Sequence, residues 1–402
     1  MTDPGLTASR RARAPTSQCG VGVGHPVTQT AGLVTPPERP KSQWDVDGAP
    51  AASHEAELAG VVRGSAAGSP RGAPRRARTI INEVQDEGDS LVRLRPVDRA
   101  EVTIVMDNFV DLLLAPAEDI RRYAPYDLGD RRQLVAEHGF SALITVEREG
   151  QRSTALYDAG LTPDGLARNL DVLEVRVRDL RAIVISHGHA DHHGGLEGLF
   201  ARYGRWRLPL VIHPEAWRER KIVLPTGAEV CLPPPSRADL EAEGLELVEE
   251  RRQTLLVDDT VLVSGQVERG TGFERGNRIH FARVEDRWEP DPMIVDDQNV
   301  IVNVKERGLV IVSGCSHAGA VNVMRNAQRL TGERRIAGFI GGCHLTGGVF
   351  EPIIQPTVEA FALADLDRVV PAHCSGWKAV HLLAQTMPAA FVQSSVGTTV
   401  SF

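Results

Sequence analysis

The stretch Ile183-Val-Ile-Ser186-His187-Gly-His189-Ala-Asp191-His192-His193-Gly-Gly195 decides how this chain is interpreted. Its short apolar run predicts a buried strand, and the Gly-Gly pair after the histidines predicts a turn into a helix. Two histidines two residues apart can point to the same side and share one cation, while Asp191 and His192 can reach a second. Imidazole and carboxylate are ligands of zinc, iron and manganese. The stretch therefore predicts a site for one or two divalent metal ions, zinc being favoured and iron or manganese being alternatives.

The overall composition excludes several classes of protein. The chain has 402 residues, a formal net charge of -8 and 42% hydrophobic residues. An acidic chain of this kind is not a typical nucleic-acid binder, and no apolar run is long enough for a transmembrane helix. Its five cysteines are widely spaced and form no CxxC pair, which argues against a zinc ribbon or a disulfide-stapled secreted fold. We expect a cytoplasmic protein with a small-molecule substrate and with neither a nucleic-acid nor a membrane partner; the sequence gives no oligomeric state.

The first 95 residues differ from the rest. Residues 1–80 contain ten Lys or Arg and six Asp or Glu, a balance of about +4, together with 19 Gly or Pro. Such a segment cannot bury enough apolar surface to offset its chain entropy. We therefore predict a disordered Pro/Gly/Ala/Arg-rich tail over 1–95 and one domain over 96–402.

The predicted domain is of the α/β class. Short β-branched runs predict strands, and stretches of helical length lie between several of them. Because strands occur in pairs as well as alternating with helices, two mixed sheets with helices outside fit better than one parallel sheet. The expected strands are 102–106, 142–146, 154–157, 182–185, 210–212, 260–263, 300–304, 309–312 and 369–370, and the expected helices are 117–124, 163–176, 193–203, 236–243, 318–330, 354–364 and 378–386.

The HxHxDH pattern at a strand end resembles the signature of the metallo-β-lactamase superfamily. This resemblance implies a four-layer αββα sandwich of two mixed β-sheets with a one- or two-metal site at the sheet edges. The segment Leu156-Tyr-Asp158-Ala-Gly160 is similar to the first motif of the superfamily, in which the Asp supports the metal ligands by hydrogen bonding. An ordinary Asx turn after a strand would give the same local pattern.

Further segments resemble one branch of the superfamily, the metal-dependent hydrolases related to dihydropterin–ribofuranosylaminobenzene phosphate synthase. The similarity runs from about residue 100 to 376. Besides the HxHxDH motif it rests on Ser313-Gly-Cys-Ser-His-Ala-Gly319, Gly341-Gly-Cys-His-Leu345 and Pro371-Ala-His-Cys-Ser-Gly376, and it extends to Met106-Asp-Asn108 and His138-Gly-Phe-Ser141.

The resemblance extends the expected metal-ligand set beyond His187, His189, Asp191 and His192. His317 and His373 each follow a strand, where the superfamily places later ligands. Cys315 stands where many members carry a bridging Asp; either its thiolate bridges two metals or a water alone does. We expect His344 to be a proton donor or an anion contact, although it could also be a ligand. Arg269 could contact an anionic substrate or could be a solvated loop charge.

The expected function is that of a metal-dependent hydrolase. A metal-activated hydroxide would attack an ester, thioester, lactone or phosphoester, with Asp191 orienting it or taking its proton. The alternative is a transferase resembling the pterin synthase of the same branch, because fold and metal site would be shared. A di-iron redox module is a third possibility, but the chain has no flavodoxin-like or rubredoxin-like domain to accompany it.

Overall fold

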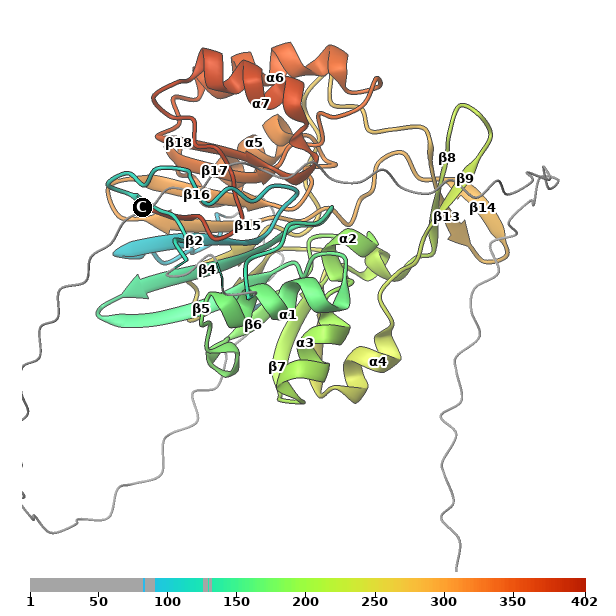
Figure 1. Cartoon of the computed structure of the whole chain (residues 1–402). Helices are drawn as coiled ribbons and strands as arrows, with labels where there is room; N and C mark the ends of the chain where they lie inside the picture. The colour runs from blue at the N-terminus through green and yellow to red at the C-terminus, as the bar shows by residue number, and fades with distance from the viewer. Residues whose placement is uncertain (1–81, 84–90, 126–128, 130–131) are drawn as a thin grey trace, which may run out of the picture. The chain divides into compact units, whose positions relative to one another are not determined.

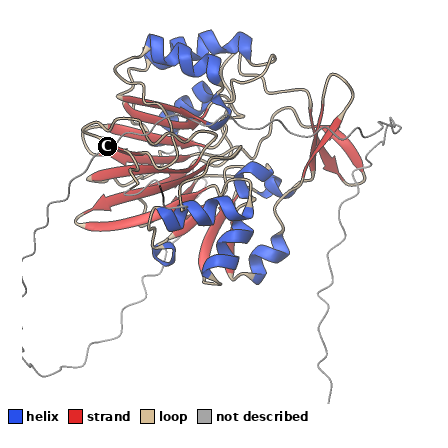
Figure 2. Ribbon diagram, in the orientation of Figure 1, coloured by secondary structure: helices blue, strands red, loops and turns tan. Residues whose placement is uncertain are grey.

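The computed structural model describes residues 82–83, 91–125, 129 and 132–402. Within these residues two large β-sheets lie face to face, and helices cover their outer faces (Figures 1 and 2). This is the αββα sandwich that the sequence predicted. No helix among the described residues is long and apolar enough to span a bilayer.

One sheet has eight strands in the order β10-β7-β6-β5-β4-β2-β19-β3. Strands β5, β6, β7 and β10 are parallel neighbours, and the remaining pairs are antiparallel. The strands are β2 (Arg99–Met106), β3 (Ile120–Arg121), β4 (Ser141–Arg148), β5 (Gln151–Tyr157), β6 (Ala182–Val184), β7 (Leu208–Ile212), β10 (Leu245–Glu249) and β19 (Thr399–Ser401).

The other sheet has seven strands in the order β1-β11-β12-β15-β16-β17-β18. Strands β16, β17 and β18 are parallel, so their carboxyl ends meet at one edge of the sheet. The strands are β1 (Asn82–Glu83), β11 (Thr254–Leu256), β12 (Val261–Val263), β15 (Val300–Val304), β16 (Gly308–Ser313), β17 (Ile336–Gly342) and β18 (Arg368–Ala372).

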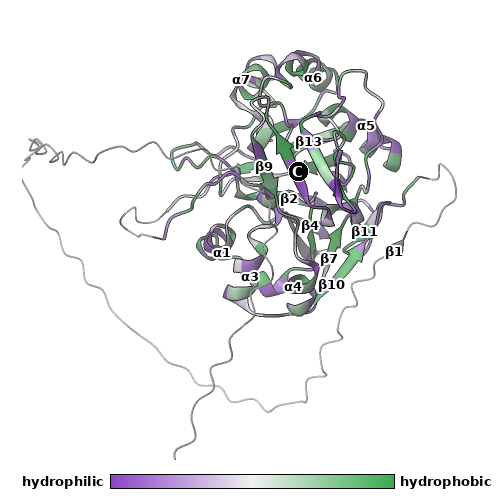
Figure 3. Cartoon of the chain, turned by 90° about the vertical axis from the view of Figure 1, so that its right-hand side faces the viewer, coloured by the Kyte–Doolittle hydropathy of each residue, from purple (hydrophilic) through white to green (hydrophobic). Residues whose placement is uncertain are grey.

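The apolar core forms three layers. Alternate residues of both sheets, such as Ile104, Val261 and Val310, pack between the sheets. The outer layers hold the sheets against amphipathic helices, whose mixed hydropathy is visible in Figure 3. The helices are α1 (Pro163–Val172), α2 (Ala190–His193), α3 (Leu196–Tyr203) and α4 (Arg237–Ala242) beside the eight-stranded sheet, and α5 (Ala320–Thr331), α6 (Glu351–Leu363) and α7 (Trp377–Thr386) beside the seven-stranded one; short 3-10 turns span Val177–Asp179, Pro214–Trp217 and His373–Ser375.

A third, four-stranded antiparallel sheet was not predicted. It lies apart from the sandwich in Figure 1 and has the order β14-β13-β8-β9. The sheet is held in place by Arg220, the first residue of β8. Its fully buried guanidinium binds Asp291 and Asp296 at 2.9 and 2.7 Å. The strands are β8 (Arg220–Val223), β9 (Glu229–Leu232), β13 (His280–Val284) and β14 (Arg287–Pro290).

Two sequence predictions about local structure need correction. The helix expected over 117–124 does not form, because Ile120–Arg121 pairs with β19 and Arg121 binds the buried carboxylate of Glu101 at 2.7 Å. The helix expected over 163–176 ends at Val172, and Glu174 has a left-handed φ of 54°.

The predicted tail boundary at residue 95 is placed too late. Val92 and Leu94 are buried against α5 and its neighbours, and the amide of Val92 donates to the carbonyl of Leu330 at 2.8 Å. Residues 91–95 therefore belong to the folded domain. The rest of the predicted tail lies outside the described residues, apart from Asn82–Glu83, which pairs with β11.

Candidate metal centre

The HxHxDH stretch lies where β6 ends and the short helix α2 begins. The turn requires glycine at 188, because a Cβ there would lie 2.2 Å from the carbonyl oxygen of Ala216. The Gly188 amide also donates to Asp296 Oδ2 at 2.8 Å. Close packing and this hydrogen bond together fix the loop that carries the histidines.

The first group of ligand atoms comes from His187, His189 and His317. One nitrogen of each ring lies within 4.8 Å of the others. The His187 Nε2 to His189 Nδ1 distance is 3.0 Å, and the ring of His317 lies 4.7 and 4.9 Å from the other two. The Nε2 atoms of His189 and His317 are buried and have no hydrogen-bond partner among the described residues. Three converging imidazoles with unpartnered nitrogens fit a divalent cation.

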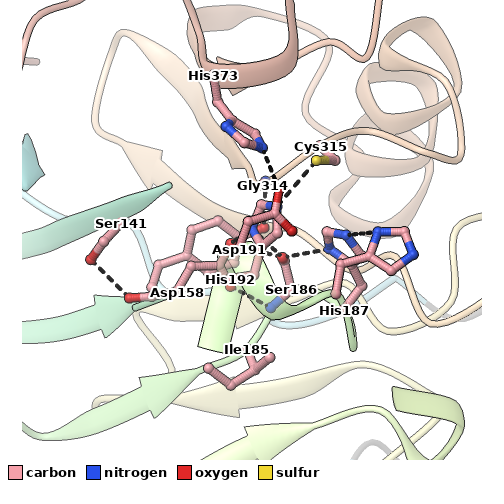
Figure 4. Close-up of polar contacts among 12 residues, drawn as sticks. Ser141, Asp158, Ile185, Ser186, His187, Asp191, His192, Gly314, Cys315 and His373 are labelled. Carbon is pink, nitrogen blue, oxygen red and sulfur yellow. Dashed lines mark hydrogen bonds and ion pairs between the residues drawn. The ribbon is translucent and has the colours of Figure 1, made fainter. Parts of the chain in front are cut away.

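The second group gathers around Asp191, as Figure 4 shows. Its Oδ2 lies 3.2 Å from His373 Nε2 and 3.8 Å from His192 Nε2. His192 Nε2 is also 3.2 Å from the sulfur of Cys315. The ring of His187 is 4.2 Å from that of His192, so the two groups adjoin. The donors fit a second cation, with Cys315 placed near both.

A buried carboxylate supports these ligands. Asp158 Oδ2 accepts hydrogen bonds from Ser186 Oγ at 2.7 Å and from His192 Nδ1 at 2.6 Å, and its Oδ1 accepts from the Ser186 amide at 2.7 Å. Ser186 Oγ then lies 2.9 Å from His187 Nδ1. The Nδ1 atoms of both histidines are thus bound to this network, and their Nε2 atoms face the other candidate ligands.

The pKa values of His192 and Asp191 are shifted in opposite directions. Burial disfavours a charged His192, but the negative charges of Asp158 and Asp191 outweigh it and raise the pKa of His192 to about 9. Burial also opposes ionisation of Asp191, yet His192 and His373 hold its pKa well below its usual range. Without metal the site therefore holds a proton on His192 that a cation has to displace.

Four further candidate site residues follow the carboxyl ends of the three parallel strands β16, β17 and β18. Cys315 and His317 follow β16, His344 follows β17, and His373 follows β18. His344 and His373 have positive φ angles of 46° and 50°. Such strained conformations in non-glycine residues are concentrated at functional sites. The His373 loop is further held by Asp107, whose Oδ1 accepts from the His373 amide at 2.7 Å.

His344 faces the same pocket as His317, one member of the first group. Its ring lies 4.2 Å from that of His317, and its Nδ1 has no partner among the described residues. Both histidines line a pocket of about 220 Å³ whose other walls include Phe273, Leu345 and Phe350. The role of His344 stays a prediction.

Two further histidines, which the sequence analysis did not single out as site residues, lie at the centre. The side chain of His138 is 66% exposed, and its Nε2 lies 3.7 Å from Asp191 Oδ2. His280, on β13 of the third sheet, stacks on His189 with ring centroids 5.5 Å apart. His138 belongs to the segment His138-Gly-Phe-Ser141, whose similarity to the synthase-related branch could have indicated a site residue. Nothing in the sequence around His280 indicated its position.

Arg269 is not the solvated loop charge that was one of its two expected roles. It is partly buried and donates to the carbonyl oxygens of His317, at 3.0 Å, and Met293. Burial and the loss of hydration lower its pKa. Its neighbour Glu274 accepts from the amides of Val321 and Asn322 at 2.8 and 2.9 Å, and so caps α5. Both side chains position the loop that carries His317.

Comparison with known proteins agrees with this geometry. The family model of the metallo-beta-lactamase superfamily matches residues 136–321, which include the HxHxDH stretch and His317. A solved structure described as a metal-dependent hydrolase of the beta-lactamase superfamily shares the fold, with a TM-score of 0.56 and 23% identity over 75% of this chain and 98% of its own. The chain is thus similar to the metallo-beta-lactamase superfamily over these residues and shares the fold of this hydrolase.

Along most of its folded part the chain is also similar in sequence to two proteins of Methanocaldococcus jannaschii. One is 7,8-dihydropterin-6-methyl-4-(beta-D-ribofuranosyl)-aminobenzene-5'-phosphate synthase, 28% identical over 66% of this chain and 90% of the relative. The other is an uncharacterized protein, 29% identical over 63% of this chain and 90% of its own length. The resemblance to the branch of this synthase is therefore confirmed.

Proposed function

We propose that the protein is a metal-dependent hydrolase that cleaves an ester, thioester, lactone or phosphoester of a small molecule. One observation carries the proposal: six side chains, from the β6 loop and from the ends of β16 and β18, converge with their ligand atoms unpartnered or facing one another. These ligands are His187, His189, Asp191, His192, His317 and His373.

The donor set fits zinc best, because it combines imidazoles with one carboxylate and a nearby thiol. When bound, one or two such cations would supply Lewis acidity and a water of lowered pKa. The chain's own residues have to orient the reacting groups and move protons. We assign the orienting role to Asp191, whose Oδ2 lies between His192 and His373.

His344 is placed to serve the leaving group. It lines the pocket beside His317 and carries a ring nitrogen without a partner among the described residues. In this position it can donate a proton to a leaving oxygen or hydrogen-bond to a developing negative charge. The pocket is of a size to hold part of a small molecule, with Phe273 and Phe350 as apolar walls. The cytoplasmic location expected from the sequence stays a prediction.

A transferase resembling the relative from M. jannaschii is the second candidate. It is favoured by the similarity that extends over 90% of that synthase. Transfer and hydrolysis would differ in which nucleophile reaches the substrate, while the cation ligands would be the same.

A substrate panel tests both proposals. Protein stripped of metal and reloaded with zinc or manganese should hydrolyse at least one chromogenic ester, lactone or phosphodiester, and the double variant His187→Ala/His189→Ala should lose this activity. The exposed His381 offers a matched control, because His381→Ala removes an imidazole outside the site. A loaded protein that is inactive on the whole panel but condenses a pterin diphosphate with an aminobenzene acceptor would favour the transferase.

A further inference from the structure

Three side chains occupy equivalent positions after neighbouring parallel strands. Cys315, His344 and Cys374 each stand two residues beyond the last residue of β16, β17 and β18. Because these strands are paired in order, their carboxyl ends bring the three side chains together. One donor atom of each lies within 4.8 Å of the others.

The sequence of the central strand permits this approach. At the end of β17, a Cβ on Gly342 would lie 2.2 Å from the carbonyl oxygen of Gly314 and 2.8 Å from the sulfur of Cys374. Any larger residue there would therefore push Cys374 away from Cys315. With glycine in place, Cys374 Sγ lies 3.6 Å from the Cys315 carbonyl oxygen.

The chemistry of the group is that of a soft cation site. Cys315 and Cys374 are buried and carry free thiols. His344 adds an imidazole whose Nδ1 has no partner among the described residues. Two sulfurs and one imidazole nitrogen suit Zn²⁺, Cd²⁺ or Cu⁺ and suit Mn²⁺ poorly.

We propose that Cys315, His344 and Cys374 form a third cation site, selective for thiophilic ions and joined through Cys315 to the group of His187 and His192. The site is distinct from the two groups above, because Cys374 and His344 belong to neither of them. A cation on one ring nitrogen of His344 leaves the other nitrogen available to hydrogen-bond a substrate. Soft ions would thus fill a position that hard ions leave empty.

Metal stoichiometry of the full chain tests the proposal. Reduced, metal-free protein is titrated with Cd²⁺ or with Mn²⁺, and the bound metal is counted by mass spectrometry. Cys374→Ser should bind one equivalent of Cd²⁺ less than the unchanged protein and the same amount of Mn²⁺. The control is Cys343→Ser, since Cys343 is also a buried free thiol next to His344 but lies outside the group; it should keep the full Cd²⁺ count.

The difference in bound Cd²⁺ between Cys374→Ser and the unchanged protein does not depend on whether the two histidine-rich groups are filled. Failure of the third site can therefore be distinguished from failure of the proposed function. Equal Cd²⁺ counts in Cys374→Ser and the unchanged protein would overturn the third site. Should Cys374→Ser not fold, cadmium NMR of the unchanged protein decides: a resonance in the range of two-thiolate sites is expected, and its absence at saturating Cd²⁺ would contradict the proposal.

Discussion

Asp158 and His192 form a fully buried pair in which the carboxylate Oδ2 lies 2.6 Å from the imidazole Nδ1. The pair joins the end of β5 to helix α2 and directs His192 Nε2 toward Asp191 and Cys315 (Figure 4). A carboxylate behind a histidine ligand fixes the ring and increases its basicity. Asp158 thereby controls both the geometry and the protonation of the second group of ligands.

The pair of Asp158 and His192 predicts that His192 releases a proton when metal binds. The pKa of His192 is raised to about 9, so His192 is protonated at pH 7 in the metal-free protein, whereas a metal-bound imidazole nitrogen carries no proton. Metal affinity should therefore rise with pH up to about 9. Asp158→Asn should release fewer protons on binding and should weaken metal affinity about 10- to 100-fold.

Titration calorimetry in two buffers of different ionisation enthalpy measures the released protons. Asp171→Asn is the control, because Asp171 is an exposed carboxylate on α1 that binds Tyr203 and Arg202. An unchanged proton count in Asp158→Asn would show that the buried pair does not control His192.

His344→Asn should separate turnover from metal content. In protein loaded with Mn²⁺ we expect turnover on a substrate from the panel to fall about a hundredfold, the lower range for loss of a general acid, while bound Mn²⁺ is unchanged. The fold should be intact, because the side chain is only partly buried and leaves little cavity. A loss of one Mn²⁺ would make His344 a ligand of the two-cation centre, and an unchanged rate would make it structural.

Truncation of the N-terminus should reveal where the folded domain begins. A chain that starts at residue 80 should keep the melting temperature and the metal content of the full chain. A chain that starts at residue 96 loses the buried side chains of Val92 and Leu94 and should be less stable by on the order of 2 kcal/mol, since chain entropy offsets part of the lost burial. Equal melting temperatures for the two truncated chains would show that residues 91–95 contribute nothing.

Much of the fold could be predicted because its signals are local. The β-branched runs of β4, β15 and β16 are continuous in sequence, and the HxHxDH stretch contains four of the proposed ligands within six residues. Ile120–Arg121 was mistaken for part of a helix because its strand pairing is with β19, at the other end of the chain. Local pattern contains no information on such a partner.

The parts of the site that were missed depend on packing between distant segments. His280 reaches His189 only because β13 belongs to a separate small sheet. That sheet is held in place by the buried ion pair of Arg220 and Asp296. The role of Arg269 likewise follows from where the carbonyls of His317 and Met293 lie in the folded chain. The position of Cys374 beside Cys315 likewise follows from the register of β16, β17 and β18.

The most direct test of the account is the metal content of His187→Ala/His189→Ala beside that of the unchanged protein, both reduced, stripped and reloaded with Zn²⁺. His187 and His189 supply two of the three imidazoles of the first group, and His187 also adjoins His192 and Cys315. The account predicts the loss of at least one equivalent of Zn²⁺, with full retention in the control His381→Ala. A double variant that still binds the full complement of Zn²⁺ would contradict the assignment of this metal centre.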